Sequence, residues 1–75
     1  MTQQPYNYTT PDWAPLERAV LAAGLPRQTC GEFMWMAEFE EGRHSYKHRN
    51  TRSYAVLRAD TPEQEAAAIV RKARG

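Results

Sequence analysis

Residues 33–58 read FMWMAEFEEGRHSYKHRNTRSYAVLR. This stretch contains both phenylalanines, both histidines, one of the two tryptophans and two of the four tyrosines in the chain. Larger apolar or aromatic residues occupy alternate positions along most of it, which is the period of a strand. The alternation is interrupted at Gly42 and again at Asn50-Thr51. The pattern therefore predicts three antiparallel strands joined by two turns.

Residues 33–41 also admit a helix that ends at Gly42, since Met, Ala and Glu are good helix formers. We favour a hairpin instead, with Glu41-Gly42 as a two-residue loop. That loop would place Glu40 opposite Arg43, Glu38 opposite Ser45, Ala37 opposite Tyr46 and Trp35 opposite His48. The predicted core face consists of Phe33, Trp35, Ala37, Phe39, His44, Tyr46 and His48. The predicted solvent face carries Met34, Met36, Glu38, Glu40, Arg43, Lys47 and Arg49.

The third strand is predicted over Ser53–Arg58. A two-residue turn at Asn50-Thr51 would place Arg49 opposite Arg52 and Arg43 opposite Arg58. Like charges in those positions repel. Either the turn is longer, or solvent or an anion separates the arginines.

One helix is predicted on each side of the sheet. The first begins near Asp12, a good N-cap, with Thr10-Pro11 as an alternative start. It ends at Gly24, before Pro26. The last helix begins after Thr61, which we expect to cap it in a capping box with Gln64. Its apolar stripe is Ala66, Ile69, Val70 and Ala73.

The predicted fold is α+β, in the order α-β-β-β-α, with a three-stranded antiparallel sheet and two helices packed on one face. A single domain should span residues 11–75. Residues 1–10 are polar and without periodicity, so we expect a disordered N-terminal tail. This order resembles that of the double-stranded RNA-binding domain and of small toxin endoribonucleases. Glu63 and Glu65 stand where the former would carry lysines, and Gly42-Arg43-His44 departs from the Gly-Ser-His element of the latter.

Composition indicates a small intracellular protein. The chain has 75 residues, a formal net charge of +1 and 25% charged residues, so any electrostatic argument must be local. Cys30 is the only cysteine, which excludes an internal disulfide. The N-terminus lacks a signal-peptide pattern and no apolar run is long enough to span a membrane, so we expect a cytoplasmic location.

The segment 43–58 contains five Arg or Lys, two His, two Tyr and no acidic residue. Cations beside an exposed aromatic on a sheet are suited to phosphate contacts and base stacking. We therefore predict that RNA, or DNA, binds a basic sheet face. The predicted nucleic-acid-binding residues are Arg43, Lys47, Arg49, Arg52, Tyr54 and Arg58.

A non-catalytic protein-interaction module is the competing hypothesis. The predicted solvent face mixes Met34, Met36, Tyr54 and Val56 with charges, as interfaces often do. The third strand is also a free edge that could pair with a partner or a second copy.

Enzymatic chemistry has less support. His44 and His48 match no zinc-ligand spacing with Cys30, so we predict no metal site and no cofactor. Both histidines are expected to pack in the core. We assign no catalytic residue, although the sequence leaves open a chemical role for His44, His48 or Cys30.

Overall fold

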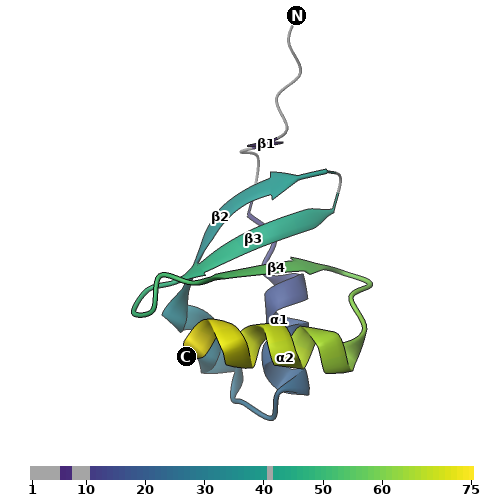
Figure 1. The fold of residues 1–75 in the computed structure, drawn as a ribbon. Helices are drawn as coiled ribbons and strands as arrows, with labels where there is room; N and C mark the ends of the chain where they lie inside the picture. The colour runs from purple at the N-terminus through teal and green to yellow at the C-terminus, as the bar shows by residue number, and fades with distance from the viewer. Residues whose placement is uncertain (1–5, 8–10, 41) are drawn as a thin grey trace, which may run out of the picture.

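The predicted α+β fold is confirmed by a computed structural model, which describes residues 6–7, 11–40 and 42–75. Its elements are β1 (Tyr6–Asn7), α1 (Ala14–Ala22), the 3-10 helix η1 (Arg27–Glu32), β2 (Phe33–Phe39), β3 (Arg43–His48), β4 (Tyr54–Arg58) and α2 (Glu63–Arg74). The strands are antiparallel in the order β1-β2-β3-β4. Figure 1 shows α1 and α2 together on one side of the sheet.

The short strand β1 extends the expected three-stranded sheet at its β2 edge. Tyr6 pairs with Phe39 and Asn7 pairs with Glu38. Of the predicted tail, residues 1–10, only these two lie among the described residues, so the expectation of disorder remains a prediction.

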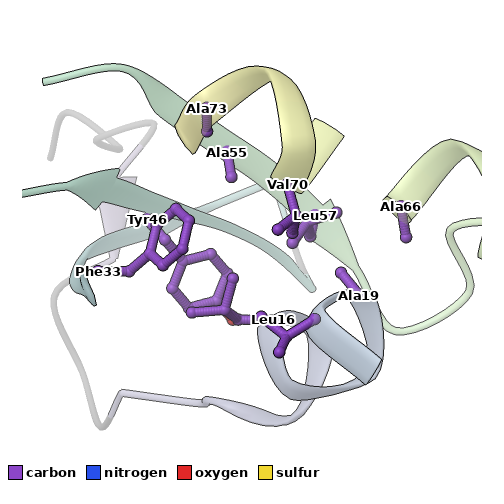
Figure 2. Packing of buried hydrophobic residues seen from close by; sticks show 10 residues of the cluster. Leu16, Ala19, Phe33, Tyr46, Ala55, Leu57, Ala66, Val70 and Ala73 are labelled. Atoms are coloured by element: carbon purple, nitrogen blue, oxygen red, sulfur yellow. The ribbon is translucent and has the colours of Figure 1, made fainter. Parts of the chain in front are cut away.

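The core fills the space between the helices and the facing side of the sheet (Figure 2). Each main element contributes to it, and its members are Leu16, Ala19, Val20, Phe33, Tyr46, Ala55, Leu57, Ala66, Val70 and Ala73. Four of these ten residues are alanines. Their small side chains allow the helix backbones to approach each other and the sheet closely, and the larger Phe33, Tyr46 and Leu57 fill the remaining volume.

Residues 33–39 form a strand, as favoured, but the predicted hairpin register is wrong. Phe39 pairs with Arg43, so three residues, 40–42, connect β2 to β3. Glu40 and Gly42 have positive φ values of 49° and 86°. Three-residue hairpin loops that need a left-handed residue are common and commonly place glycine there.

A second irregularity in β2 changes which side chains face the core. Trp35 pairs with Tyr46 but Ala37 pairs with Ser45, so Met36 is an extra residue in a β-bulge. Beyond the bulge, Ala37 shares a face with Ser45 and Glu38 shares the helix-side face with His44. Ala37 and Glu38 have thus exchanged the faces predicted for them, because one inserted residue reverses the alternation.

The helix ends differ from prediction at their N-termini. Trp13, not Asp12, is the N-cap of α1, and the Asp12 carboxylate accepts a hydrogen bond from the Ala14 N–H at 3.0 Å. Pro62 is the N-cap of α2 and no side chain caps it. The Thr61 hydroxyl instead accepts from the Arg58 N–H at 2.9 Å, so the predicted capping box is absent. Thr61 is used to close β4 rather than to open the helix.

The C-terminus of α1 is as predicted. Gly24 has φ 78°. Its N–H donates to Leu21 O at 3.0 Å, and the Leu25 N–H donates to Val20 O at 3.1 Å. These two bonds make a Schellman motif, which satisfies carbonyls that the helix end would otherwise leave open.

Candidate nucleic-acid interface

The face of the sheet opposite the helices is built by alternate residues of β3 and β4. Arg43 pairs with Arg58, Ser45 with Val56 and Lys47 with Tyr54. The intervening residues of these strands, His44, Tyr46, Ala55 and Leu57 among them, are buried on the helix side. We call the set Arg43, Ser45, Lys47, Tyr54, Val56 and Arg58 the open face; Ser45, at its centre, is itself buried. Arg43 and Arg58 are thus paired, as a two-residue turn would have placed them, although the turn between β3 and β4 is longer than two residues.

The open face has a cationic pair at one end and an aromatic–cation pair at the other. Lys47 Nζ lies 5.6 Å from the centroid of the Tyr54 ring, a distance typical of a cation–π contact. The Tyr54 side chain is half exposed and Lys47 is half-buried beside it. The ring therefore offers a stacking surface next to a positive charge.

Acidic residues at the rim contact the two arginines. Arg43 Nη1 lies 3.3 Å from Glu40 Oε2, and Arg58 Nε lies 3.8 Å from Asp60 Oδ1. Both carboxylates are well exposed, and exposed ion pairs of this kind contribute little free energy.

The bulge at Met36 removes a third carboxylate from this surface. The predicted register placed Glu38 on the solvent face, where its charge would have neutralised part of the positive charge of residues 43–58. In the structure Glu38 lies with His44, and its Oε2 accepts a hydrogen bond from the Gly42 N–H at 2.9 Å. The open face is accordingly more basic than the predicted register implied.

Two of the six predicted binding residues lie outside the strands. Arg49 and Arg52 belong to the turn between β3 and β4, where the Arg52 N–H donates to His48 O at 3.0 Å. Arg49 Nε donates to Gly31 O at 3.1 Å, which draws this side chain toward η1. Arg52 is exposed and has φ 67°. The structure therefore brings together Arg43, Lys47, Tyr54 and Arg58, with Arg52 in the turn that follows the Lys47 end.

His44 lies on the opposite face, buried between two strands and the start of α1. Trp35 Nε1–H donates to His44 Nδ1 at 2.9 Å, so in the neutral ring the proton is on Nε2. That nitrogen is 3.8 Å from both Asp12 Oδ2 and Glu38 Oε2. The neighbouring Tyr46 hydroxyl donates to Asp12 O. Burial, and secondarily the Asp12 charge, raise the pKa of Tyr46 above its ordinary value.

His48 forms a second buried cluster at the other end of β3. Its Nδ1 accepts from the N–H groups of Asn50 and Thr51 at 3.3 and 3.2 Å, and its Nε2 donates to Glu32 Oε1 at 2.9 Å. Arg74 donates to both Glu32 oxygens, at 3.0 and 3.2 Å. These bonds, from Arg74 first and His48 second, lower the pKa of Glu32 to about 2.

The two histidines thus serve as buried, hydrogen-bonded core groups, as expected from the sequence. Their partners Asp12, Glu32 and Glu38 were not predicted. No sequence signal marks these partners, because the contacts depend on the bulge in β2 and on how the segment before α1 and the end of α2 pack against the sheet.

Cys30 packs half-buried against the core. Burial, followed by the charge of Glu17, raises its pKa, which opposes formation of a reactive thiolate. Within residues 11–40 and 42–75 and the β1 pair, no three His, Cys, Asp or Glu side chains are grouped to hold a metal ion. None of the described helices is long and apolar enough to cross a membrane.

Comparison with protein-family models, with curated proteins and with solved structures finds no match to this chain.

Proposed function

We propose that the open face binds single-stranded nucleic acid, RNA in the first instance. The observation that carries this proposal is the register of β3 and β4. It sets Arg43 beside Arg58 and Lys47 beside Tyr54 on a sheet face that neither helix covers.

The chemistry of the two ends is complementary. The exposed Tyr54 ring offers a flat surface for one base, and base–aromatic stacking is worth about 1–3 kcal/mol. The cations at both ends suit the phosphates on either side. Tyr54 and Arg58 are separated by about 13 Å along β4, since a strand rises about 3.3 Å per residue. The two ends would therefore contact different nucleotides.

A single strand is a better ligand for this surface than a duplex. The open face is one side of a sheet, and stacking on Tyr54 requires a base that is not paired within a helix. The Ser45 side chain, between the two ends of β3, is buried, so the proposed contacts are made at the two ends of the open face.

The test is binding of a fluorescein-labelled RNA oligonucleotide of mixed sequence, followed by fluorescence anisotropy. Each phosphate contact to a single strand contributes about −0.7 to the slope of log K against log salt. With the three cations of the open face in contact the slope should be about −2.1, so affinity should fall about twenty-fold from 50 to 200 mM salt. Salt-insensitive binding, or none at 50 mM, contradicts the proposal.

Three variants locate the surface. Tyr54→Ala should weaken binding by about 1–3 kcal/mol with little change in the salt slope. Lys47→Gln should lower the magnitude of the slope by about 0.7. Arg27→Gln is the matched control, because Arg27 is an exposed cation on η1, away from the open face. Equal losses for Lys47→Gln and Arg27→Gln would indicate nonspecific attraction. Equal affinity for a duplex of the same sequence would contradict the proposed stacking of a base on Tyr54.

A further inference from the structure

The outer edge of β4 carries a short, defined set of main-chain groups. The His48 N–H donates to Ser53 O at 2.8 Å. Because hydrogen-bonded pairs alternate along an antiparallel ladder, Ser53, Ala55 and Leu57 direct their backbone groups at β3. The residues between them, Tyr54 and Val56, direct their N–H and C=O groups outward.

Arg58 would be the next outward residue, but its groups are already used. Its N–H donates to Thr61 Oγ1 at 2.9 Å, and its carbonyl accepts from the Thr61 N–H at 3.2 Å. The edge available for an added strand therefore consists of four groups, from Tyr54 and Val56.

A groove of about 320 Å³ follows this edge, between β4 and α2. Its lining residues are Ser53, Tyr54, Val56, Ile69, Lys72 and Ala73. The Tyr54 and Val56 side chains are 52% and 37% exposed. Unpaired main-chain groups beside an apolar groove are the two components of recognition by strand addition.

The charges on α2 indicate what fills the groove. Glu65, Ile69 and Lys72 follow one another at i, i+4 and i+7 and so form one stripe of the helix. Ile69 and Lys72 line the groove, and Glu65 is one turn before Ile69 on the same stripe. The stripe has an acid at one end, an apolar residue near the middle and a base at the other end. Such a stripe is complementary to itself when turned by 180°.

We propose that the occupant is a second copy of this chain, docked edge to edge by two-fold symmetry. In the register centred on Ala55, Tyr54 of each copy pairs with Val56 of the other. This pairing satisfies all four outward groups of each strand and joins an aromatic to a β-branched side chain, a favourable cross-strand pair. A register centred on Val56 would instead require the groups of Arg58 that Thr61 already binds.

The same symmetry axis aligns the helices. The two α2 helices run antiparallel across the interface, so Glu65 of one copy faces Lys72 of the other, with the two Ile69 side chains near the axis. The dimer stands independently of nucleic-acid binding. Its consequence for the surface is that the two open faces become neighbours in one continuous sheet, with two copies each of Tyr54 and Val56 at the centre.

The experiment is sedimentation equilibrium of the full chain over a range of protein concentrations. The wild-type protein should show a reversible monomer–dimer equilibrium. Val56→Lys should raise the dimer dissociation constant at least tenfold, since a lysine at an edge opposes strand pairing. Leu21→Lys is the matched control, because Leu21 is an apolar residue of α1 that is 49% exposed. This variant should associate like wild type. Circular dichroism verifies that each variant is folded.

Charge reversal tests the pairing of the helices without altering the sheet. Glu65→Lys and Lys72→Glu should each raise the dimer dissociation constant, by about tenfold for two repulsive contacts per dimer. The double variant should restore the wild-type value, because it exchanges the two signs. Failure of this restoration overturns the proposed pairing. A wild-type chain that is monomeric at every concentration, or a Val56→Lys variant that associates like Leu21→Lys, overturns the dimer and leaves the edge for a strand of another protein.

Discussion

Glu32 joins three segments that are distant in the sequence: the end of η1, the end of β3 and the last turn of α2. Its carboxylate accepts from the buried His48 ring and from the Arg74 guanidinium. Because the pKa of Glu32 in the folded protein, about 2, lies below its ordinary value of 4.5, the charged form favours folding. This stabilisation is fully present above pH 4.5 and is lost as the pH falls toward 2.

Two substitutions at Glu32 separate the ion pair from the buried hydrogen bond. Glu32→Gln keeps an oxygen for the His48 N–H and loses only the charge, so it should cost about 1 kcal/mol at neutral pH, given the partial exposure of the carboxylate. Glu32→Ala also leaves the His48 N–H without its acceptor, which should cost a further 1–3 kcal/mol, roughly. Urea denaturation at pH 7 and pH 3 measures both.

The pH dependence of the free energy of unfolding tests the contacts of Glu32 with Arg74 and His48 more directly. The stability difference between wild type and Glu32→Gln should narrow between pH 4.5 and pH 2, as the wild-type carboxylate loses its advantage. A difference that is constant over this interval would mean that Glu32 is not held in its charged form by Arg74 and His48.

The hairpin of β2 and β3 shows which features of an element the sequence predicts and which it does not. Alternating apolar residues correctly identified both strands. The register was wrong because Glu40-Glu41-Gly42 is compatible with a two-residue or a three-residue loop, and both need glycine near the end. The bulge at Met36 has no sequence signature, because Met34 and Met36 flank Trp35 in regular alternation.

The error in the β2–β3 register affects only some of the residues predicted for the candidate site. Arg43, Lys47, Tyr54 and Arg58 share a face in the predicted and in the observed arrangement, because the relation between β3 and β4 was correct. Glu38 moved to the helix side with the bulge. Arg49 was expected on the solvent face of the sheet, but its contact with Gly31 depends on the path of η1, which no local pattern specifies.

The hairpin loop also gives a direct test of its conformation. Gly42 has φ 86°, and a Cβ added there would meet nothing within 4 Å. Gly42→Ala should therefore cost only the conformational penalty of a left-handed alanine, about 1–2 kcal/mol. Gly31→Ala is the control, since its Cβ also meets nothing within 4 Å and its φ lies outside the left-handed region.

Urea denaturation of the two alanine variants provides the comparison. The midpoint should fall for Gly42→Ala and stay close to wild type for Gly31→Ala. Equal midpoints would show that residue 42 does not require the left-handed conformation and that the three-residue loop is wrong.

For the whole molecule, the core is small, so the free energy lost in one core substitution is comparable to the total free energy of unfolding. A domain of 75 residues is stabilised by about 3–5 kcal/mol. Of the twelve buried hydrophobic residues in the part of the chain that the structure describes, six are alanines, so a few larger side chains supply most of the apolar area removed from water. Leu57 is one of them, 1% exposed, where β4 faces α2 (Figure 2).

Leu57→Ala should therefore come close to unfolding the entire domain. Removing a buried leucine side chain costs about 2–5 kcal/mol, which is comparable to the total stability. Leu21→Ala makes the same chemical change on the surface of α1 and should cost at most about 0.5 kcal/mol. Thermal unfolding followed by circular dichroism, at concentrations low enough to keep the chain monomeric, compares the two. A Leu57→Ala midpoint as high as that of Leu21→Ala would place the core elsewhere than between β4 and the helices.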